Sequence, residues 1–270
     1  MLTTRFVTGS LVWADFSTPD IEGANAFYGT LFGWDAESSG EEFGGYVMYR
    51  SDGKDVAGGM AVPPEQGPAA WSLYFRTPDA DAAAKAAEQA GGAVVFEPMD
   101  VGDLGRMAVL KDAEGASFGV WQPGVMQGFG AVQVPGSLCW AELYAADVPA
   151  AAAFYSAVLG LQSFDVPFPG GSYTTLHPAG TEADAMFGGI LPAAAAPAGA
   201  DGGAHWLPYF EVTDCDSAAR RAGELGGAVR KAPTDLEGVG RTAHLADPYG
   251  ARFAVLKSVP QEGSGAGAKP

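Results

Sequence analysis

The chain has 270 residues, 47% of them hydrophobic and 17% charged, so it has ample material for a buried core and little sign of disorder. Acidic residues outnumber basic ones by 32 to 15, and the formal net charge of −17 makes nucleic acid and anionic membrane surfaces poor partners. The sequence shows no long apolar run, no secretory signal pattern and only two cysteines, Cys139 and Cys215. We therefore expect a cytoplasmic globular protein without a disulfide framework or a structural zinc site.

The first elements in chain order are a strand and a helix. Residues 10–16 are rich in β-forming types and predict a strand that ends at Thr18-Pro19-Asp20. Asp20 is suited to cap the helix that follows, and Gly33 is suited to end it. The apolar residues of this helix fall on one face: Ala24, Phe27, Tyr28 and Leu31.

Strands predominate in the next part of the chain. Residues 46–50 and 56–62 predict two strands joined by the hairpin signal Asp52-Gly53. Residues 71–76 predict another strand, followed by an alanine-rich helix that Asp79 or Asp81 caps. Three more short strands follow this helix, so the pattern is strand, helix, strands, and then the same again.

The second half of the chain repeats the first. Residues 9–34 match residues 136–161 at 11 of 26 positions, and residues 71–120 match residues 206–255 at 23 of 50 positions. Agreement over such a length indicates a tandem duplication. The second copy is eight residues longer because its loop around residues 192–203 is extended.

The duplication predicts the domain boundaries. We expect a first module over residues 1–122 and a second module over residues 136–257. Residues 123–135 contain glycines and no helical period, which is typical of a linker. Residues 258–270 predict a flexible tail that cannot bury apolar surface.

Several short segments together resemble a known superfamily. Thr18-Pro19-Asp20, a helix with Phe27-Tyr28, and then Leu31-Phe32-Gly33-Trp34 are similar to the first unit of the vicinal oxygen chelate superfamily. This superfamily includes glyoxalase I, extradiol dioxygenases and bleomycin-resistance proteins. The segments at residues 225–229 and 247–251 resemble its second βαβββ unit.

The resemblance is narrower still because both copies carry Gly-Arg before the last hairpin, at Gly105-Arg106 and Gly240-Arg241. Paired modules of this kind resemble actinobacterial glyoxalase-like proteins. The resemblance implies an α+β fold in which four βαβββ units form two half-open eight-stranded barrel modules. It also implies a cavity on the concave face of each barrel.

The superfamily takes its name from a divalent metal whose ligands lie on the first and last strands of the units. At the positions that match, this sequence has Trp13, Ser72, Gly119, Trp140, Leu207 and Ala254. Indole, aliphatic groups and glycine do not supply the imidazole, carboxylate or thiolate donors that a divalent cation needs. We therefore expect no metal and no other cofactor at the usual place, with a divalent metal bound elsewhere as the alternative.

Side chains alternate along a strand, so the family's ligand positions also identify the concave face. The concave positions in the first copy are Trp13, Asp15, Ser72, Tyr74, Met107, Val109 and Trp121. Those in the second copy are Trp140, Glu142, His205, Leu207, Tyr209, Thr242, His244 and Leu256. Several matched pairs differ in chemistry, which indicates that the two cavities have diverged: Ala70 and His205, Met107 and Thr242, Val109 and His244.

Two functions are consistent with these side chains. The first is a metal-independent binder of an aromatic or other small metabolite. Its expected ligand-binding residues are Trp13, Asp15, Ser72, Tyr74, Met107, Trp121, Trp140, Glu142, Leu207 and Tyr209. The competing interpretation of the aromatic positions is that they only fill closed barrels.

The second function is a glyoxalase-like lyase or hydroxylase, with or without a divalent metal. Glu142, His205 and His244 would be its catalytic residues, either as an acid–base set or as a displaced metal site. His177 is expected to face solvent. Arg106 and Arg241 are expected either to contact Asp112 and Asp247 in a turn or to hold a substrate carboxylate.

The expected partner is a small molecule alone. The two copies are expected to pack against each other as an internal pseudo-dimer within a monomer. A homodimer of the whole chain is the other possibility.

Overall fold

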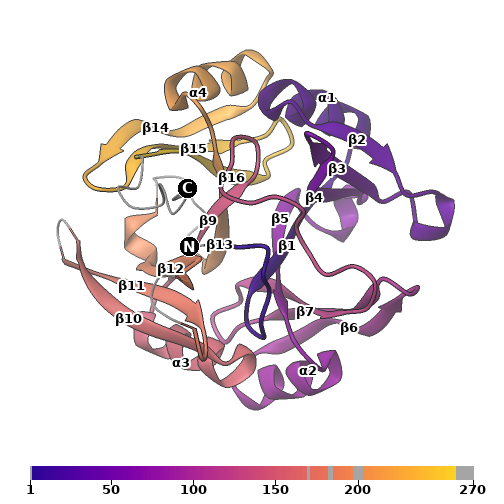
Figure 1. Cartoon of the computed structure of the whole chain (residues 1–270), viewed down its shortest axis with the longest axis vertical. Helices are drawn as coiled ribbons and strands as arrows, with labels where there is room; N and C mark the ends of the chain where they lie inside the picture. Colours follow the sequence, from indigo (N-terminus) through magenta and orange to yellow (C-terminus); the bar gives the residue numbers. More distant parts are fainter. Residues whose placement is uncertain (1, 169–170, 182–184, 197–202, 260–270) are drawn as a thin grey trace, which may run out of the picture.

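The computed structural model, drawn in Figure 1, describes residues 2–168, 171–181, 185–196 and 203–259, except for the side chain of residue 168. Most of the predicted tail, from residue 260 onward, lies outside the described residues. So do residues 197–202 of the loop that lengthens the second copy. No helix in the described ranges is long and apolar enough to cross a bilayer.

The described chain forms two eight-stranded sheets. The first sheet consists of β1 (Leu11–Thr18), β2 (Asp35–Ser38), β3 (Val47–Ser51), β4 (Lys54–Ala61), β5 (Ala70–Arg76), β6 (Ala93–Val101), β7 (Gly105–Lys111) and β8 (Ser117–Pro123). The second sheet consists of β9 (Leu138–Ala145), β10 (Leu161–Phe168), β11 (Gly171–Pro178), β12 (Gly188–Pro192), β13 (His205–Glu211), β14 (Ala228–Leu236), β15 (Gly240–Ala246) and β16 (Arg252–Ser258). The α+β fold with two half-open barrel modules, as expected from the sequence, is confirmed.

Both sheets have the same strand order. The first runs β2-β3-β4-β1-β5-β8-β7-β6 and the second runs β10-β11-β12-β9-β13-β16-β15-β14. In each sheet two βαβββ units meet at a central antiparallel pair, β1 with β5 and β9 with β13. This arrangement brings residues from four strands of each sheet together on one concave face.

Four helices follow the first strands of the four units: α1 (Ile21–Phe32), α2 (Ala80–Gln89), α3 (Val148–Leu159) and α4 (Cys215–Glu224). Each begins at an aspartate whose carboxylate accepts a hydrogen bond from a backbone N–H three residues later: Asp20, Asp79, Asp147 and Asp214. Helix α1 ends at Gly33, which has the left-handed φ of 74° that glycine adopts readily. The predicted cap at Asp20 and stop at Gly33 are therefore present, and Asp79 rather than Asp81 caps α2.

The linker between the sheets packs against the first half instead of lying free. Phe129 is almost fully buried, and its ring centroid lies 5.4 Å from that of Trp13. Its backbone N–H donates to the carbonyl of Val12 at 2.9 Å. The linker thus covers one end of the first concave face.

The two halves pack against each other through their helix-bearing faces, with α1 beside α4 and α2 beside α3 (Figure 1). Aromatic side chains fill the contact. The ring centroids of Trp71 and Phe210 lie 5.0 Å apart, and those of Phe75 and Trp206 lie 5.3 Å apart. The main hydrophobic core is therefore shared by both halves.

A reciprocal pair of hydrogen bonds crosses this contact. The Tyr28 hydroxyl donates to Asp247 and the Tyr155 hydroxyl donates to Asp112, both at 3.1 Å. Burial raises the pKa of both carboxyl groups, while the hydrogen bonds that they accept act in the opposite direction. Each half thus satisfies a buried acid of the other.

The prediction that Arg106 and Arg241 contact Asp112 and Asp247 in a turn is wrong. Arg106 forms ion pairs with Asp81 and Asp100. Arg241 forms the matching pairs with Asp216 and Asp235. Both arginines stand at the start of a strand that runs beside a helix, so they reach the first turn of that helix and the neighbouring edge strand instead of the distant hairpin.

Candidate functional site

Strand register explains why particular side chains meet on the first concave face. Trp13 pairs with Tyr74, Tyr74 pairs with Gly119, and Gly119 pairs with Val109. Directly paired residues point to the same side of a sheet, so these side chains form one row across four strands. Asp15 lies two residues after Trp13 and therefore on the same face.

The row surrounds a carboxyl group. The indole Nε1 of Trp13 donates to the Tyr46 hydroxyl at 2.8 Å, and that hydroxyl donates to Asp15 Oδ2 at 3.2 Å. Tyr74 also hydrogen-bonds to this carboxyl. Burial raises the pKa of Asp15 to about 7, although both tyrosine bonds act to lower it. The first face therefore centres on an acid that titrates near neutral pH.

The second concave face repeats this cluster with a glutamate. Trp140 Nε1 donates to the Tyr173 hydroxyl at 2.8 Å, and Tyr173 donates to Glu142 Oε1 at 3.3 Å. Tyr209 and Tyr144 donate to Glu142 Oε2 at 2.5 and 3.0 Å. Burial raises the pKa of Glu142, and the tyrosine hydrogen bonds counteract part of that effect. Three phenols thus enclose this acid.

Glycines make room for the tyrosines that reach the acids. A Cβ added at Gly58 would lie 1.8 Å from the Tyr46 hydroxyl oxygen, and one added at Gly119 would lie 2.1 Å from Tyr74 Cδ1. In the second half, a Cβ at Gly189 would lie 2.4 Å from the Tyr173 ring. The rings lie directly over the bare backbone, so these glycines are required by the clusters.

The structure brings the three predicted catalytic residues of the second half into one neighbourhood. His244 Nε2 lies 3.2 Å from the Tyr209 hydroxyl, which also contacts Glu142. The ring of His205 stacks on Tyr144 at a centroid distance of 5.1 Å, and its Nδ1 bonds to the carbonyl of Gly203. Burial lowers the pKa of His244 to about 4, so its imidazole is neutral near pH 7. The hydrogen bonds of the two histidines go to Gly203 and Tyr209 and not to Glu142.

The other predicted ligand-binding residues lie around these clusters. Ser72 pairs with Asp15 across β1 and β5, and Leu207 pairs with Glu142 across β9 and β13. Met107 pairs with Trp121 near one end of the first face, where Trp121 Nε1 donates to the carbonyl of Met126 in the linker at 2.9 Å.

Tyr46, Tyr173 and Tyr144 were not predicted, although all three contact the acids or their neighbours. Tyr46 and Tyr173 match at the shift of 127 residues, so comparison of the two copies would have found them. Tyr144 replaces Ser17 of the first copy, and only its place on the concave face of β9 identifies it.

The side chains at the family's metal positions do not fit a divalent cation. The Tyr74 ring covers Gly119, and Trp13, Trp140, Leu207 and Ala254 offer no donor suited to a metal. Ser72 adds a single hydroxyl, which is too little for a ligand set. Among the described residues, no group of three or more His, Cys, Asp or Glu side chains is arranged to hold a metal ion.

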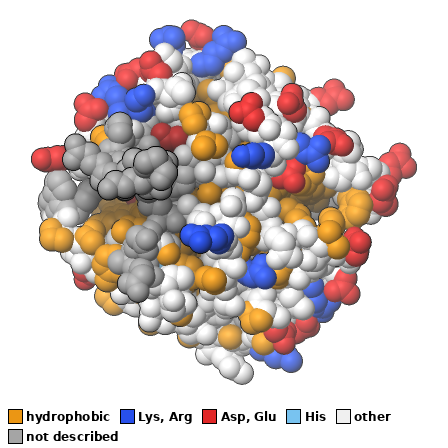
Figure 2. Space-filling model, viewed as in Figure 1, with side chains coloured by type: hydrophobic (Ala, Val, Ile, Leu, Met, Phe, Trp, Pro, Cys, Tyr) orange, Lys and Arg blue, Asp and Glu red, His pale blue; other side chains and the backbone are white. Residues whose placement is uncertain are grey.

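The first concave face is apolar and partly open. Phe96 and Met99 are 58% and 52% exposed, and Met60 is 38% exposed. The register places them on the same side as Val109, Met107 and Ser17 respectively. In Figure 2, apolar side chains line a hollow on the side of the molecule that carries the first sheet. On the second face Lys231 and Thr234 take the places of Phe96 and Met99 and are half-buried and exposed, respectively. Nearer the acid, Tyr144, Leu207, Tyr209 and Leu256 are buried in one cluster.

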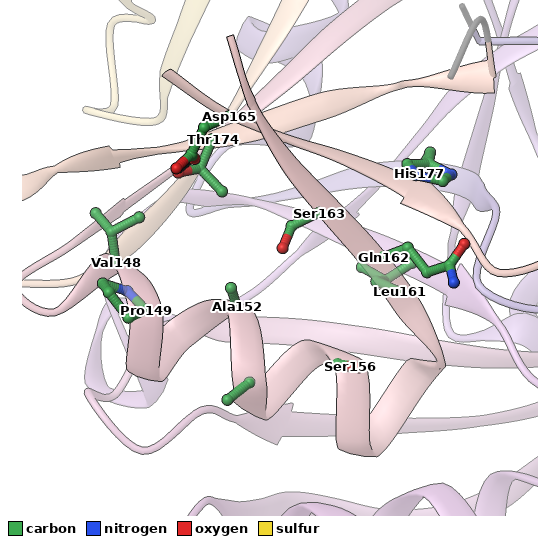
Figure 3. A pocket seen from close by; sticks show the side chains of 11 residues that line it. Val148, Pro149, Ala152, Ser156, Leu161, Gln162, Ser163, Asp165, Thr174 and His177 are labelled. Carbon is green, nitrogen blue, oxygen red and sulfur yellow. Dashed lines mark hydrogen bonds between the residues drawn. The ribbon is translucent and has the colours of Figure 1, made fainter. Parts of the chain in front are cut away.

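A separate groove of about 750 Å³ lies between α3 and the strands β10 and β11 (Figure 3). Ala152 and Ser156 line it from the helix, and Ser163 and Asp165 line it from β10. It lies on the helix side of the sheet, away from the Glu142 cluster. His177, also in its lining, is buried, so the expectation that it faces solvent is wrong. Its ring packs against Phe164 at a centroid distance of 5.6 Å, and its Nδ1 bonds to Pro178 and Thr181.

The paired βαβββ sheets and their matched concave clusters define a vicinal oxygen chelate fold. The chain belongs to the Glyoxalase/Bleomycin resistance protein/Dioxygenase superfamily, whose sequence pattern matches residues 10–120 and 137–255. It is 41% identical over 274 residues to the anthracycline biosynthesis protein DnrV of Streptomyces peucetius, covering 94% of this chain and 95% of DnrV. It is 37% identical over 266 residues to CFP32 of Mycobacterium bovis, a protein named as a glyoxylase, covering 96% of this chain and 98% of CFP32.

Solved structures of low sequence identity share the fold. The 2,3-dioxygenase LapB from Pseudomonas sp. KL28 has a TM-score of 0.63 at 16% identity, covering 95% of this chain and 96% of LapB. The Mn(II)-bound glyoxalase from Novosphingobium aromaticivorans has a TM-score of 0.60 at 16% identity, covering 94% of this chain and 85% of that one. At this identity the likeness shows the architecture alone.

Proposed function

We propose that the protein binds a planar aromatic metabolite on its concave faces, without a divalent cation. The observation that carries this proposal is the cluster of tryptophan, two tyrosines and an enclosed carboxyl group that both halves contain. Aromatic side chains bind planar molecules through large contact areas and offset stacking. A few convergent polar groups, here the phenols and the acid, fix the orientation of such a ligand.

The name of one relative, an anthracycline biosynthesis protein, suggests which kind of aromatic ligand this protein binds. Anthracyclines have a planar fused-ring system with carbonyl and phenolic hydroxyl groups on its edges. The apolar side chains of the first face suit the rings, and the phenols and acids suit the edge oxygens. We therefore propose a polycyclic hydroxyquinone as the ligand class.

The test is isothermal titration calorimetry with 1,8-dihydroxyanthraquinone as the probe. Trp13→Phe and Trp140→Phe each remove one indole and its hydrogen bond, and each should weaken binding at its own face. An aromatic contact contributes about 0.5–1.5 kcal/mol, so the expected loss of affinity is about two- to tenfold. Trp206→Phe is the matched control, since Trp206 donates to Tyr155 between the halves and not on a concave face.

The same titration after removal of metal ions tests whether binding needs a divalent cation. Protein dialysed against EDTA should bind the probe as well as untreated protein does. The proposal fails if no heat of binding is seen, or if binding is lost on dialysis and restored by a divalent cation.

A further inference from the structure

The two concave faces differ at three matched positions that lie side by side. On β6 and β7 the first half has Phe96, Met107 and Val109. At the same places on β14 and β15 the second half has Lys231, Thr242 and His244. Lys231 pairs with His244 in the sheet, as Phe96 pairs with Val109. One face therefore presents apolar groups where the other presents an ammonium, a hydroxyl and an imidazole.

The unpartnered hydroxyl of Thr242 is evidence that a ligand binds here. Thr242 is 1% exposed, and its Oγ1 has no hydrogen-bond partner within the described ranges. A buried hydroxyl without a partner is destabilising, so its presence in a folded protein calls for an explanation. Thr242 lies two residues before His244 on the same strand and therefore faces the same side. A ligand oxygen on this face would satisfy it.

Beside this hydroxyl runs a chain of hydrogen bonds. Glu142 Oε2 lies 2.5 Å from the Tyr209 hydroxyl, and this hydroxyl lies 3.2 Å from His244 Nε2. Tyr209 and His244 are each paired with Ala254, whose small side chain lets them meet across β16. The other ring nitrogen of His244, Nδ1, forms no hydrogen bond with any described residue.

We propose that the second concave face takes up a proton from a phenolic or enolic hydroxyl of its ligand through His244 and Tyr209 to Glu142, whereas the first face binds ring systems without proton transfer. This inference rests on the proposed function and assigns a distinct ligand chemistry to one of its two faces. Of the three predicted catalytic residues, His244 passes the proton on, Glu142 accepts it, and His205 only packs against Tyr144.

Every proton that moves in this transfer comes from the ligand or from the protein and ends on one of them. The ligand O–H bond breaks and its proton binds His244 Nδ1, while the proton on Nε2 passes to the Tyr209 oxygen. The Tyr209 proton passes to the Glu142 carboxylate. The net result is a ligand oxyanion, a neutral Glu142 and a His244 that has only exchanged one tautomer for the other.

The surrounding groups suit this transfer. Burial stabilises the protonated form of Glu142, the final acceptor. Tyr144, Tyr173 and Tyr209 face Glu142, and His205 and Lys231 act electrostatically on His244. The positive charge of Lys231 lies next to His244 on the neighbouring strand, where it favours the ligand oxyanion.

The test uses the visible absorption of bound 1,8-dihydroxyanthraquinone, because ionisation of a phenolic hydroxyl on a quinone shifts its band to longer wavelength. At a pH below the pKa of the free probe, binding to the unmodified protein should produce the anion band. His244→Gln and Tyr209→Phe should each remove most of this band, while calorimetry still detects probe binding. The matched control is His177→Gln, because His177 lies in the separate groove beside α3.

The band should also disappear in His244→Val, which installs the residue that the first half carries at this position and is therefore suited to the fold. If the probe binds but stays neutral, or if the band survives in all three relay variants, the proton transfer is refuted while the binding proposal stands. If calorimetry finds no binding, both proposals fall.

Discussion

Replacing Asp15 by asparagine should remove a large pH dependence of stability. The Asp15 pKa is about 7 in the fold and 3.8 for a free side chain. The folded state therefore holds this proton more tightly, and unfolding releases it between the two values. The contribution is fully present below pH 4 and is lost as the pH rises to about 7. At 1.36 kcal/mol for each pKa unit, the change amounts to up to about 4 kcal/mol.

The measurement is the free energy of unfolding in urea between pH 4 and pH 8. Other buried acids also titrate, so the informative quantity is the difference between Asp15→Asn and the unmodified protein at each pH. This difference should be small at pH 4 and should favour the variant by several kcal/mol at pH 8. Glu65→Gln, at an exposed position, should give a flat difference within about 0.5 kcal/mol. A flat difference for Asp15→Asn would show that its carboxyl is well solvated and that the described enclosure is wrong.

The remaining predictions concern the contact between the halves and the glycines under the tyrosines. Tyr155→Phe leaves the buried Nε1 of Trp206 without its acceptor and should lower the free energy of unfolding by about 2–4 kcal/mol, measured by urea denaturation. Tyr249→Phe, which removes an exposed hydrogen bond, should cost less than about 1 kcal/mol, and equal losses would contradict the role of burial. Gly119→Ala should displace the Tyr74 ring and lower stability by about 1–3 kcal/mol, with weaker probe binding in calorimetry; unchanged binding would mean that this ring does not shape the face.

Much of the fold could be predicted because the same sequence pattern occurs in both copies of the repeat. A helix cap at Asp20, a stop at Gly33 and a shared Phe-Tyr pair recur at equal spacing, and local rules apply to both copies. The short edge strand at residues 35–38 could not be located individually, because all its side chains are exposed and carry no apolar alternation. The partners of Arg106 were also missed, since they depend on how a strand and a helix lie side by side.

The concave site could be predicted in part for a similar reason. Alternation along single strands identified Trp13, Asp15 and Tyr74, which share one face whatever the rest of the chain does. Tyr46 was missed because it precedes β3 and reaches Asp15 only by lying across Gly58 on β4, a contact set by pairing between distant strands. The relay through Tyr209 was likewise hidden, because it depends on the small residue at Ala254 between two larger ones.

The helix-side contact between the halves has a consequence for how a duplicated gene can change. Phe210 packs on Trp71, Trp206 packs on Phe75, and each half hydrogen-bonds an acid of the other, so neither copy can alter this surface alone without harming both. On the concave side, by contrast, the hydrogen bonds of each acid cluster join residues of one half. Sequence change after duplication is therefore less restricted on the concave strands, and the two copies can diverge there while they remain parts of one chain.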